Sequence, residues 1–166
     1  MITNQEFNKN LDEFLLILLD NLSLDGIEYH VLNHYSKSVF GDKQYAFFSI
    51  SVSCLRLDCT ISYDDLYTVP VINIRLYNND KLLMDPNSQT ILKTNTSVIQ
   101  LQNHHLLQEP WLQIHPCETL ETIDTHLRNV PESKKYNDTL TYLCCWFGIY
   151  GLPTMFPQFS FRPHVY

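Results

Sequence analysis

The tripeptide His115-Pro116-Cys117 is the part of this chain whose residue types and order could do chemistry. It lies between an apolar run, residues 111–114, and a segment with the composition of a helix, residues 118–123. A thiol just before a helix is favoured as thiolate by the first backbone N–H groups and by the positive end of the helix dipole. Pro116 cannot continue a strand ladder, so the chain must present the thiol from a turn. The pattern predicts a cysteine nucleophile, and the competing interpretation is a small buried apolar side chain.

Other residues carry weaker chemical signals. His104 and His105 could join Cys117 as metal ligands, but adjacent histidines lack the spacing of a zinc site, and we expect no metal and no cofactor. Cys54 and Cys59 are five positions apart, which places them on opposite faces of one continuous strand, so they are not expected to act together. Three acidic residues could hold a cation or position an incoming lysine, although acidic turns are usually only solvated: Asp58, Asp64 and Asp65.

Length and composition exclude several classes of protein. The chain has 166 residues, 45% apolar and 17% charged, which predicts a single folded domain without a run long enough to span a membrane. Its amino terminus lacks the pattern of a secretory signal, so we expect the cytoplasm. The five cysteines form no Cys-x-x-Cys pair and are expected to be free thiols. The net charge of −7 argues against nucleic acid as a partner.

The first element expected to support the reactive turn is an amino-terminal helix. Thr3 and Glu6 have the spacing of a capping box, and leucines and phenylalanines recur at three- and four-residue steps up to Gly26, where we expect the helix to end. Residues 27–77 are rich in β-branched and aromatic side chains with turn-forming breaks. Their short connections leave no room for crossover helices, which predicts an antiparallel meander.

The middle of the chain is the hardest part to interpret. Residues 80–110 are polar and turn-rich, and within them residues 96–101 could form a short helix or a strand. After Cys117, apolar residues fall on one helical face until Pro131 stops the run. We therefore predict a helix between the reactive turn and this proline.

The carboxyl-terminal part is strongly apolar and aromatic. Asn137 or Asp138 is expected to cap a largely buried helix that ends by Gly151. We take residues 1–151 as the folded unit and residues 152–166 as an aromatic, proline-rich extension of the same domain. Three prolines and alternating aromatic residues predict that this extension is an extended strand or a bound ribbon rather than a helix.

Two motifs make the chain resemble the autophagy branch of the ubiquitin-conjugating enzymes. Members of that branch have His-Pro-Cys where ordinary members have His-Pro-Asn, and the cysteine of the tripeptide is their thioester site. Upstream, residues 63–71 followed by residues 72–76 are similar to the family's tyrosine, proline and outgoing strand. The resemblance covers about residues 1–150 and fits the compact, single-domain type of the branch. It implies an α+β ubiquitin-conjugating-like fold with an N-terminal helix, an antiparallel meander sheet and C-terminal helices.

The resemblance also implies a transferase reaction. An activating enzyme, autophagy-related protein seven, would pass a ubiquitin-like protein, autophagy-related protein twelve, to Cys117 as a thioester. A lysine of the acceptor, autophagy-related protein five, would then take it by aminolysis. Cys117 occupies the position of the family's asparagine, which donates to the oxyanion, so the donor must come from elsewhere. We assign that role to Tyr67, and His115 is a second donor or a structural residue.

Two further functions are compatible with parts of the pattern. A papain-like cysteine hydrolase would pair Cys117 with a distant histidine, nominally His126 or His164, but the order and the flanking residues do not match. A catalytically inactive module of the same fold could bind ubiquitin-like proteins through its sheet. Retention of the cysteine in the tripeptide argues against that alternative.

An antiparallel meander leaves free backbone groups at its margins, and this chain is poor in the charges that usually protect a strand edge. We therefore expect the acceptor protein to bind by pairing with a strand edge. The ribbon at residues 156–166 would either cover such an edge or extend the contact.

Overall fold

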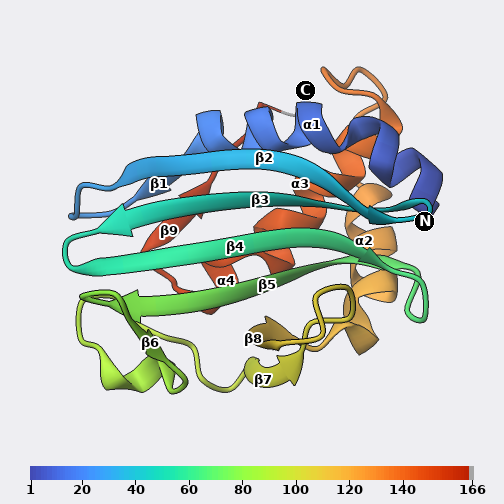
Figure 1. Cartoon of the computed structure of the whole chain (residues 1–166). Coiled ribbons are helices and arrows are strands. Elements are labelled where there is room, and N and C mark those ends of the chain that lie inside the picture. The colour runs from blue at the N-terminus through green and yellow to red at the C-terminus, as the bar shows by residue number, and fades with distance from the viewer. Residues whose placement is uncertain (165–166) are drawn as a thin grey trace.

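The computed structural model describes residues 1–164 and, of Glu118, the backbone alone. Figure 1 shows a large antiparallel sheet with the helices gathered on one face and the other face left open. The elements follow the chain in this order: α1 (Asn4–Asn21), β1 (Leu22–Leu24), β2 (His30–Phe40), β3 (Lys43–Val52), β4 (Leu55–Asp64), β5 (Val69–Asn78), β6 (Lys81–Leu83), η1 (Pro86–Ser88), β7 (Ile99–Asn103), β8 (Pro110–Ile114), η2 (Pro116–Glu118), α2 (Thr119–Leu127), α3 (Asp138–Tyr150), α4 (Leu152–Met155) and β9 (Phe159–Phe161).

The large sheet has the strand order β2-β3-β4-β5-β8-β7, and β6 pairs with the far end of β5. Strands β2 to β5 form a meander of antiparallel neighbours. β8 then pairs with the middle of β5 through Asn73 opposite Gln113 and Ile74 opposite Leu112. This pairing sets the end of β8, and the turn with Cys117 that follows it, beside the start of β5. The predicted α+β fold with an antiparallel meander is confirmed.

The amino-terminal helix begins as the capping box predicts. The Thr3 hydroxyl accepts a hydrogen bond from the Glu6 backbone N–H, and the Glu6 carboxylate accepts one from the Thr3 backbone N–H. The predicted end at Gly26 is wrong, because α1 ends at Asn21. The chain becomes extended at Leu22 so that β1 can pair with β9, a contact with the other end of the molecule that no local signal announces.

The hydrophobic core lies between the helices and the covered face of the sheet. Alternate residues of β3 and β4 point into it and meet α1 and α3, as the period of two in a strand requires. The fully buried aromatic side chains in this layer include Phe14 on α1, Phe48 on β3, and Trp146 and Phe147 on α3. This core is the rigid support for the loops at the end of the sheet where Cys117 lies.

The segment without a clear signal is only partly regular. Ile99–Asn103 is a strand, β7, which resolves the alternative of helix or strand in residues 96–101. It pairs with β8 along its whole length, from Ile99 opposite Ile114 to Asn103 opposite Pro110. The hairpin between the two strands, from His104 to Glu109, folds back over the open face of the sheet, where the His104 ring contacts Thr60 of β4. The buried His104 of this hairpin thus has a polar partner on the sheet.

The carboxyl-terminal ribbon packs inside the molecule. α3 ends before Gly151, where an added Cβ would lie 2.3 Å from the carbonyl oxygen of Phe147. The prediction that this segment is extended rather than helical is wrong at its start, because Leu152–Met155 forms a short helix, α4. The strand β9 follows, as predicted, and both Phe156 and Phe159 are buried. β9 pairs with β1 in a separate two-stranded sheet. The expectation that the ribbon covers or extends an edge of the main sheet is therefore wrong for the described residues up to 164.

The two margins of the main sheet differ in exposure. All eleven residues of β2 are exposed, and several are large and apolar, including Leu32, Tyr35 and Phe40. Within residues 1–164, β2 pairs with β3 alone, so its outer backbone groups have no strand partner. No helix in that range is long and apolar enough to cross a membrane.

Candidate active site

Cys117 lies in a sharp turn between β8 and α2. It belongs to a single 3₁₀ turn, η2 (Pro116–Glu118), in which Pro116 is buried and Cys117 is exposed. His115 precedes this turn, and its Nδ1 accepts a hydrogen bond from the backbone N–H of Cys117 at 3.3 Å. The proline ends the strand and the histidine ring caps the short helix, so both neighbours serve to present the thiol to solvent.

Tyr67 meets His115 across the site, although the two are 48 positions apart. The Tyr67 Oη lies 3.4 Å from Nε2 of His115, and the rings pack edge to face with centroids 5.3 Å apart. Because Nδ1 of His115 accepts from the Cys117 backbone, the neutral ring carries its proton on Nε2. Nε2 therefore donates to the Tyr67 oxygen, and the hydroxyl proton of Tyr67 is left to donate elsewhere.

Three hollows converge on this turn. One of about 240 Å³ lies between Cys117, Tyr150 of α3 and the segment before β7. A second of about 510 Å³ runs from Cys117 along one face of α2, past Asp124 to Arg128. A third of about 270 Å³ lies on the open face of the sheet beside Tyr67 and His115. The thiol is thus open to a peptide chain from more than one direction.

The four other cysteines differ from Cys117. Cys59 and Cys144 are buried, and burial raises the pKa of both thiols, that of Cys144 to about 12. Cys145 is half-buried, and burial raises its pKa also. Cys54 is exposed in the turn between β3 and β4, at the end of β4 opposite the Tyr67 turn. Cys54 and Cys117 are therefore the two exposed thiols, and Cys117 is the one whose backbone N–H is bound by His115.

The histidine pair is structural. His104 is fully buried, its Nδ1 accepts from the backbone N–H groups of Leu106 and Leu107, and its Nε2 lies 2.8 Å from the Thr60 hydroxyl. Burial lowers the pKa of His104 to about 3, so the ring is neutral at pH 7. His105 stacks on it. Among the described residues no group of histidine, cysteine and acidic side chains could hold a metal ion.

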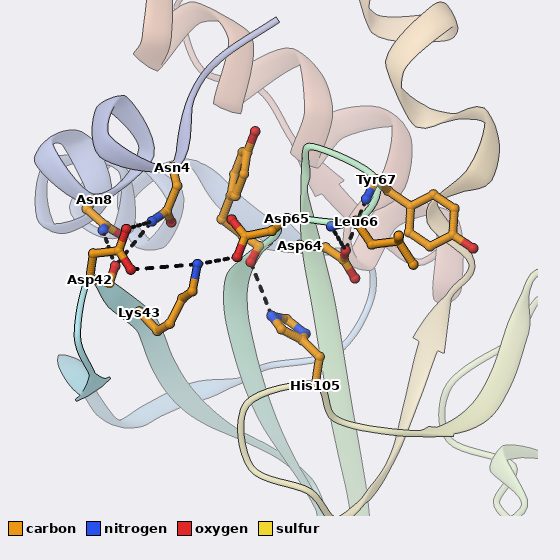
Figure 2. A network of polar contacts seen from close by, with 10 residues as sticks. Asn4, Asn8, Asp42, Lys43, Asp64, Asp65, Leu66, Tyr67 and His105 are labelled. Atoms are coloured by element: carbon orange, nitrogen blue, oxygen red, sulfur yellow. Dashed lines mark hydrogen bonds and ion pairs between the residues drawn. The ribbon is translucent and has the colours of Figure 1, made fainter.

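The acidic candidates are occupied by protein partners. Asp58 accepts from Arg56 and Ser49, and Asp65 pairs with Lys43. Asp64 accepts from two backbone N–H groups of the turn that carries Tyr67 (Figure 2). Each of the three carboxylates thus has hydrogen-bond or ion-pair partners within the protein.

The histidines named for a hydrolase are not placed to act on Cys117. His126 lies near the end of α2, nine positions after Cys117 in the sequence, and it is exposed. His164 is exposed beyond β9. Neither residue lines the hollows that contain Cys117.

Sequence reasoning missed a ladder of amide side chains next to the site. Asn73 Nδ2 donates to Gln113 Oε1 at 2.7 Å, and Gln113 Nε2 donates to Gln102 Oε1 at 2.6 Å. The ladder crosses β5, β8 and β7 on the open face, and both glutamines line the third hollow. Glutamines at alternate positions 100 and 102 were the available signal, because alternation places them on one face of a strand.

The fold consists of an amino-terminal helix on an antiparallel meander, a turn with an exposed cysteine after the last strand of the main sheet, and closing helices. Together these features define the ubiquitin-conjugating type of fold. Comparison with known proteins narrows the class. A family model described as "Autophagocytosis associated protein, active-site domain" matches residues 36–160. The ubiquitin-like-conjugating enzyme ATG10 of Candida albicans is 56% identical over the whole chain and 94% of its own length. The enzyme of the same name from Arabidopsis thaliana is 27% identical over 57% of the chain and 46% of its own length.

Two solved structures share the fold. A solution structure of KmAtg10 matches with a TM-score of 0.55 and 19% identity, covering 90% of this chain and 92% of the other. A crystal structure of the autophagic E2 Atg10 matches with a TM-score of 0.53 and 16% identity, covering 93% and 96%. The chain therefore belongs to the ATG10 family and is a ubiquitin-like-conjugating enzyme of autophagy, a transferase. Of the predicted classes, neither the hydrolase nor the inactive module agrees with this result.

Proposed function

We propose that the chain accepts autophagy-related protein twelve as a thioester on Cys117 and transfers it to a lysine of autophagy-related protein five. Autophagy-related protein seven would supply the activated cargo. The observation that carries this proposal is the exposed Cys117 thiol in a turn capped by His115, with hollows on two sides. We place the reaction in the cytoplasm, where a chain with five free cysteines keeps its thiols reduced.

The proposed chemistry uses one sulfur twice. The Cys117 thiolate attacks the thioester carbonyl on the activating enzyme, and the enzyme's own thiolate leaves. In the second transfer a neutral lysine amine attacks the Cys117 thioester, the tetrahedral intermediate collapses with loss of the Cys117 thiolate, and the amine proton passes to solvent. Both steps pass through an oxyanion, which a hydrogen-bond donor must stabilise.

Tyr67 is the proposed donor to that oxyanion. Its hydroxyl receives a hydrogen bond from His115 Nε2, so its own proton is free to point toward the acyl group on Cys117. A donor of this kind is worth about 3 to 4 kcal/mol when it is removed from other acyl-transfer enzymes. His115 then has two roles, as cap of the Cys117 turn and as the group that orients Tyr67.

We further propose that the acceptor pairs with the β2 edge. That strand offers an unpaired backbone and exposed apolar side chains, and Lys37 is its one permanently charged residue. A strand added there would gain backbone hydrogen bonds from the edge and specificity from alternate side chains. Leu32→Lys with Val39→Lys should weaken acceptor binding at least tenfold and leave charging of Cys117 intact. Leu16→Lys, at an exposed position of α1, is the matched control.

One assay tests the main proposal. The protein is incubated with the activating enzyme, ATP and the cargo, and the products are separated by nonreducing electrophoresis. A band that disappears on treatment with thiol, and that Cys117→Ala does not form, supports the thioester. A conjugate on the acceptor lysine that still forms with Cys117→Ala would refute it.

A further inference from the structure

The turn between β4 and β5 has an unfavourable backbone conformation and little packing to stabilise it. Thr68 has φ of 55°, in the left-handed region that a β-branched residue adopts only when its surroundings impose it. Leu66 in the same turn is 83% exposed, so packing does not restrain the tip. Tyr67 lies between these two residues and is only half-buried. The position of its hydroxyl therefore depends on polar contacts to the turn.

Asp64 supplies the main contacts. Its Oδ1 accepts hydrogen bonds from the backbone N–H of Leu66 at 2.9 Å and from that of Tyr67 at 3.1 Å. The Thr68 hydroxyl donates to the Tyr67 carbonyl at 2.7 Å. The peptide groups on both sides of Tyr67 are thus held by side chains, and Figure 2 shows the Asp64 carboxylate beneath the turn with Tyr67 projecting from it.

A second set of contacts ties the turn to the body of the protein. Asp65 pairs with Lys43 at the start of β3. The neighbouring Asp42 accepts from the side-chain amides of Asn4 and Asn8 on α1, so this group links the turn to the amino-terminal helix (Figure 2). From the other side, the His105 ring lies 3.2 Å from the Tyr63 carbonyl just before the turn.

We infer that Asp64 is a positioning residue for the transfer reaction: its carboxylate holds the turn so that Tyr67 meets both His115 and the acyl group on Cys117. The inference rests on the proposed role of Tyr67 as oxyanion donor. An oxyanion donor must be held within tenths of an ångström, because small misplacements lose much of its effect. Asp64 also lines the hollow beside Tyr67, where a lysine could approach, so a direct effect of its charge is the competing explanation.

The amide variant separates the two explanations. Asp64→Asn keeps a side-chain oxygen for the two N–H groups and removes the charge, whereas Asp64→Ala removes both. If Asp64 acts by holding the turn, Asn restores most of the activity that Ala loses. If its charge acts directly on the incoming amine, both variants lose activity alike.

The experiment charges each variant with cargo and then follows discharge of the isolated thioester to free lysine in a single turnover. We expect Asp64→Ala to discharge about tenfold more slowly than wild type and Asp64→Asn to stay within about twofold. The double variant with Tyr67→Phe should be no slower than Tyr67→Phe alone, because Asp64 acts through Tyr67. The matched control is Asp85→Ala, which removes the same kind of contact, to the Asn87 N–H, from the distant η1 turn and should leave discharge unchanged.

Thermal melts identify any variant that loses activity because it does not fold. If Asp64→Ala does not fold, the discharge rate of Asp64→Asn is compared with those of wild type and Tyr67→Phe. Equal losses in the Ala and Asn variants, additive losses in the double variant, or a normal rate for Tyr67→Phe would each overturn the inference. Failure of wild-type protein to form the Cys117 thioester would instead overturn the proposed function, and that step is measured first.

Discussion

The reactive turn and the aromatic rear of the molecule use the same residue types in opposite ways. In the turn, Cys117 is exposed and Tyr67 is half-buried, and hydrogen bonds hold their backbones. In the rear, formed by α3, α4 and β9, Cys144 is buried and aromatic side chains such as Phe156 fill the core. Exposure to solvent explains the difference. Burial disfavours the charged thiolate, whereas burial of an apolar side chain stabilises the fold.

This contrast predicts two kinds of mutational effect. Changes in the turn should remove chemistry and leave the fold, since few buried contacts are lost there. Changes in the rear should remove stability first, and activity only as a consequence. Measuring activity and stability on the same variants distinguishes the two.

The largest effect is expected at Cys117. Cys117→Ala should abolish both charging and conjugation, while its melting temperature stays within a few degrees of wild type because the side chain is exposed. Cys117→Ser should either form an ester that resists thiol reductants or form no adduct. The matched controls are Cys54→Ala and Cys145→Ala, which should still charge. Loss of charging in these controls would contradict the assignment of the reaction to Cys117 alone.

The second effect is a loss of folding stability when buried side chains of α3, α4 and β9 or their surroundings are changed. Phe156→Ala should lower the free energy of unfolding by about 3 to 5 kcal/mol, because it empties a fully buried site. Removal of residues 154–166 would take away this side chain and β9 together, so the truncated chain should not fold. Urea denaturation measures both. Phe40→Ala makes the same change at a position that is 60% exposed and should cost less than about 0.5 kcal/mol. A truncated chain with a normal unfolding transition would contradict this view of the rear.

The third effect concerns the Tyr67 hydroxyl in the reactive turn. Tyr67→Phe removes one hydroxyl and should slow discharge of the thioester by about ten- to a hundredfold, or about 1.4 to 2.7 kcal/mol, with little change in stability. Charging should slow less than discharge. Single-turnover kinetics give both rates, and Tyr77→Phe, near the end of β5 remote from the Tyr67 turn, is the control for loss of a phenol elsewhere. Equal discharge rates for Tyr67→Phe and wild type would leave Tyr67 as a packing residue.

The last effect is a dependence of the free energy of unfolding on pH, caused by a buried thiol in the rear. Burial raises the pKa of Cys144 from its usual 9.0 to about 12, so above pH 9 the unfolded chain loses a proton that the folded protein keeps. The free energy of unfolding should therefore fall as the pH rises from 9 to 12. Cys144→Val should flatten this fall, and Cys54→Val, at an exposed thiol, should not. An unchanged slope in Cys144→Val would mean that Cys59 and buried tyrosines account for the dependence.

Local signals in the sequence were sufficient for the elements that depend on neighbouring residues. The capping box at Thr3, the strand alternation and the Pro116 break each reflect backbone constraints within a few positions, and each appears in the fold. The exposed Cys117 turn follows from the same logic, because a proline after a strand forces the chain out of the sheet. These constraints act at short range, so they can be predicted without knowing the rest of the molecule.

Long-range contacts settled what neighbouring residues could not. Leu22 leaves α1 because β9 pairs with it from the far end of the chain, and the ribbon is buried for the same reason. Tyr67 meets His115 through the β5–β8 pairing, and Asp64 accepts hydrogen bonds from two backbone N–H groups of its own turn. Each of these outcomes depends on which surfaces are left uncovered once the sheet and helices have packed. That is a property of the assembled core, and no short stretch of sequence records it.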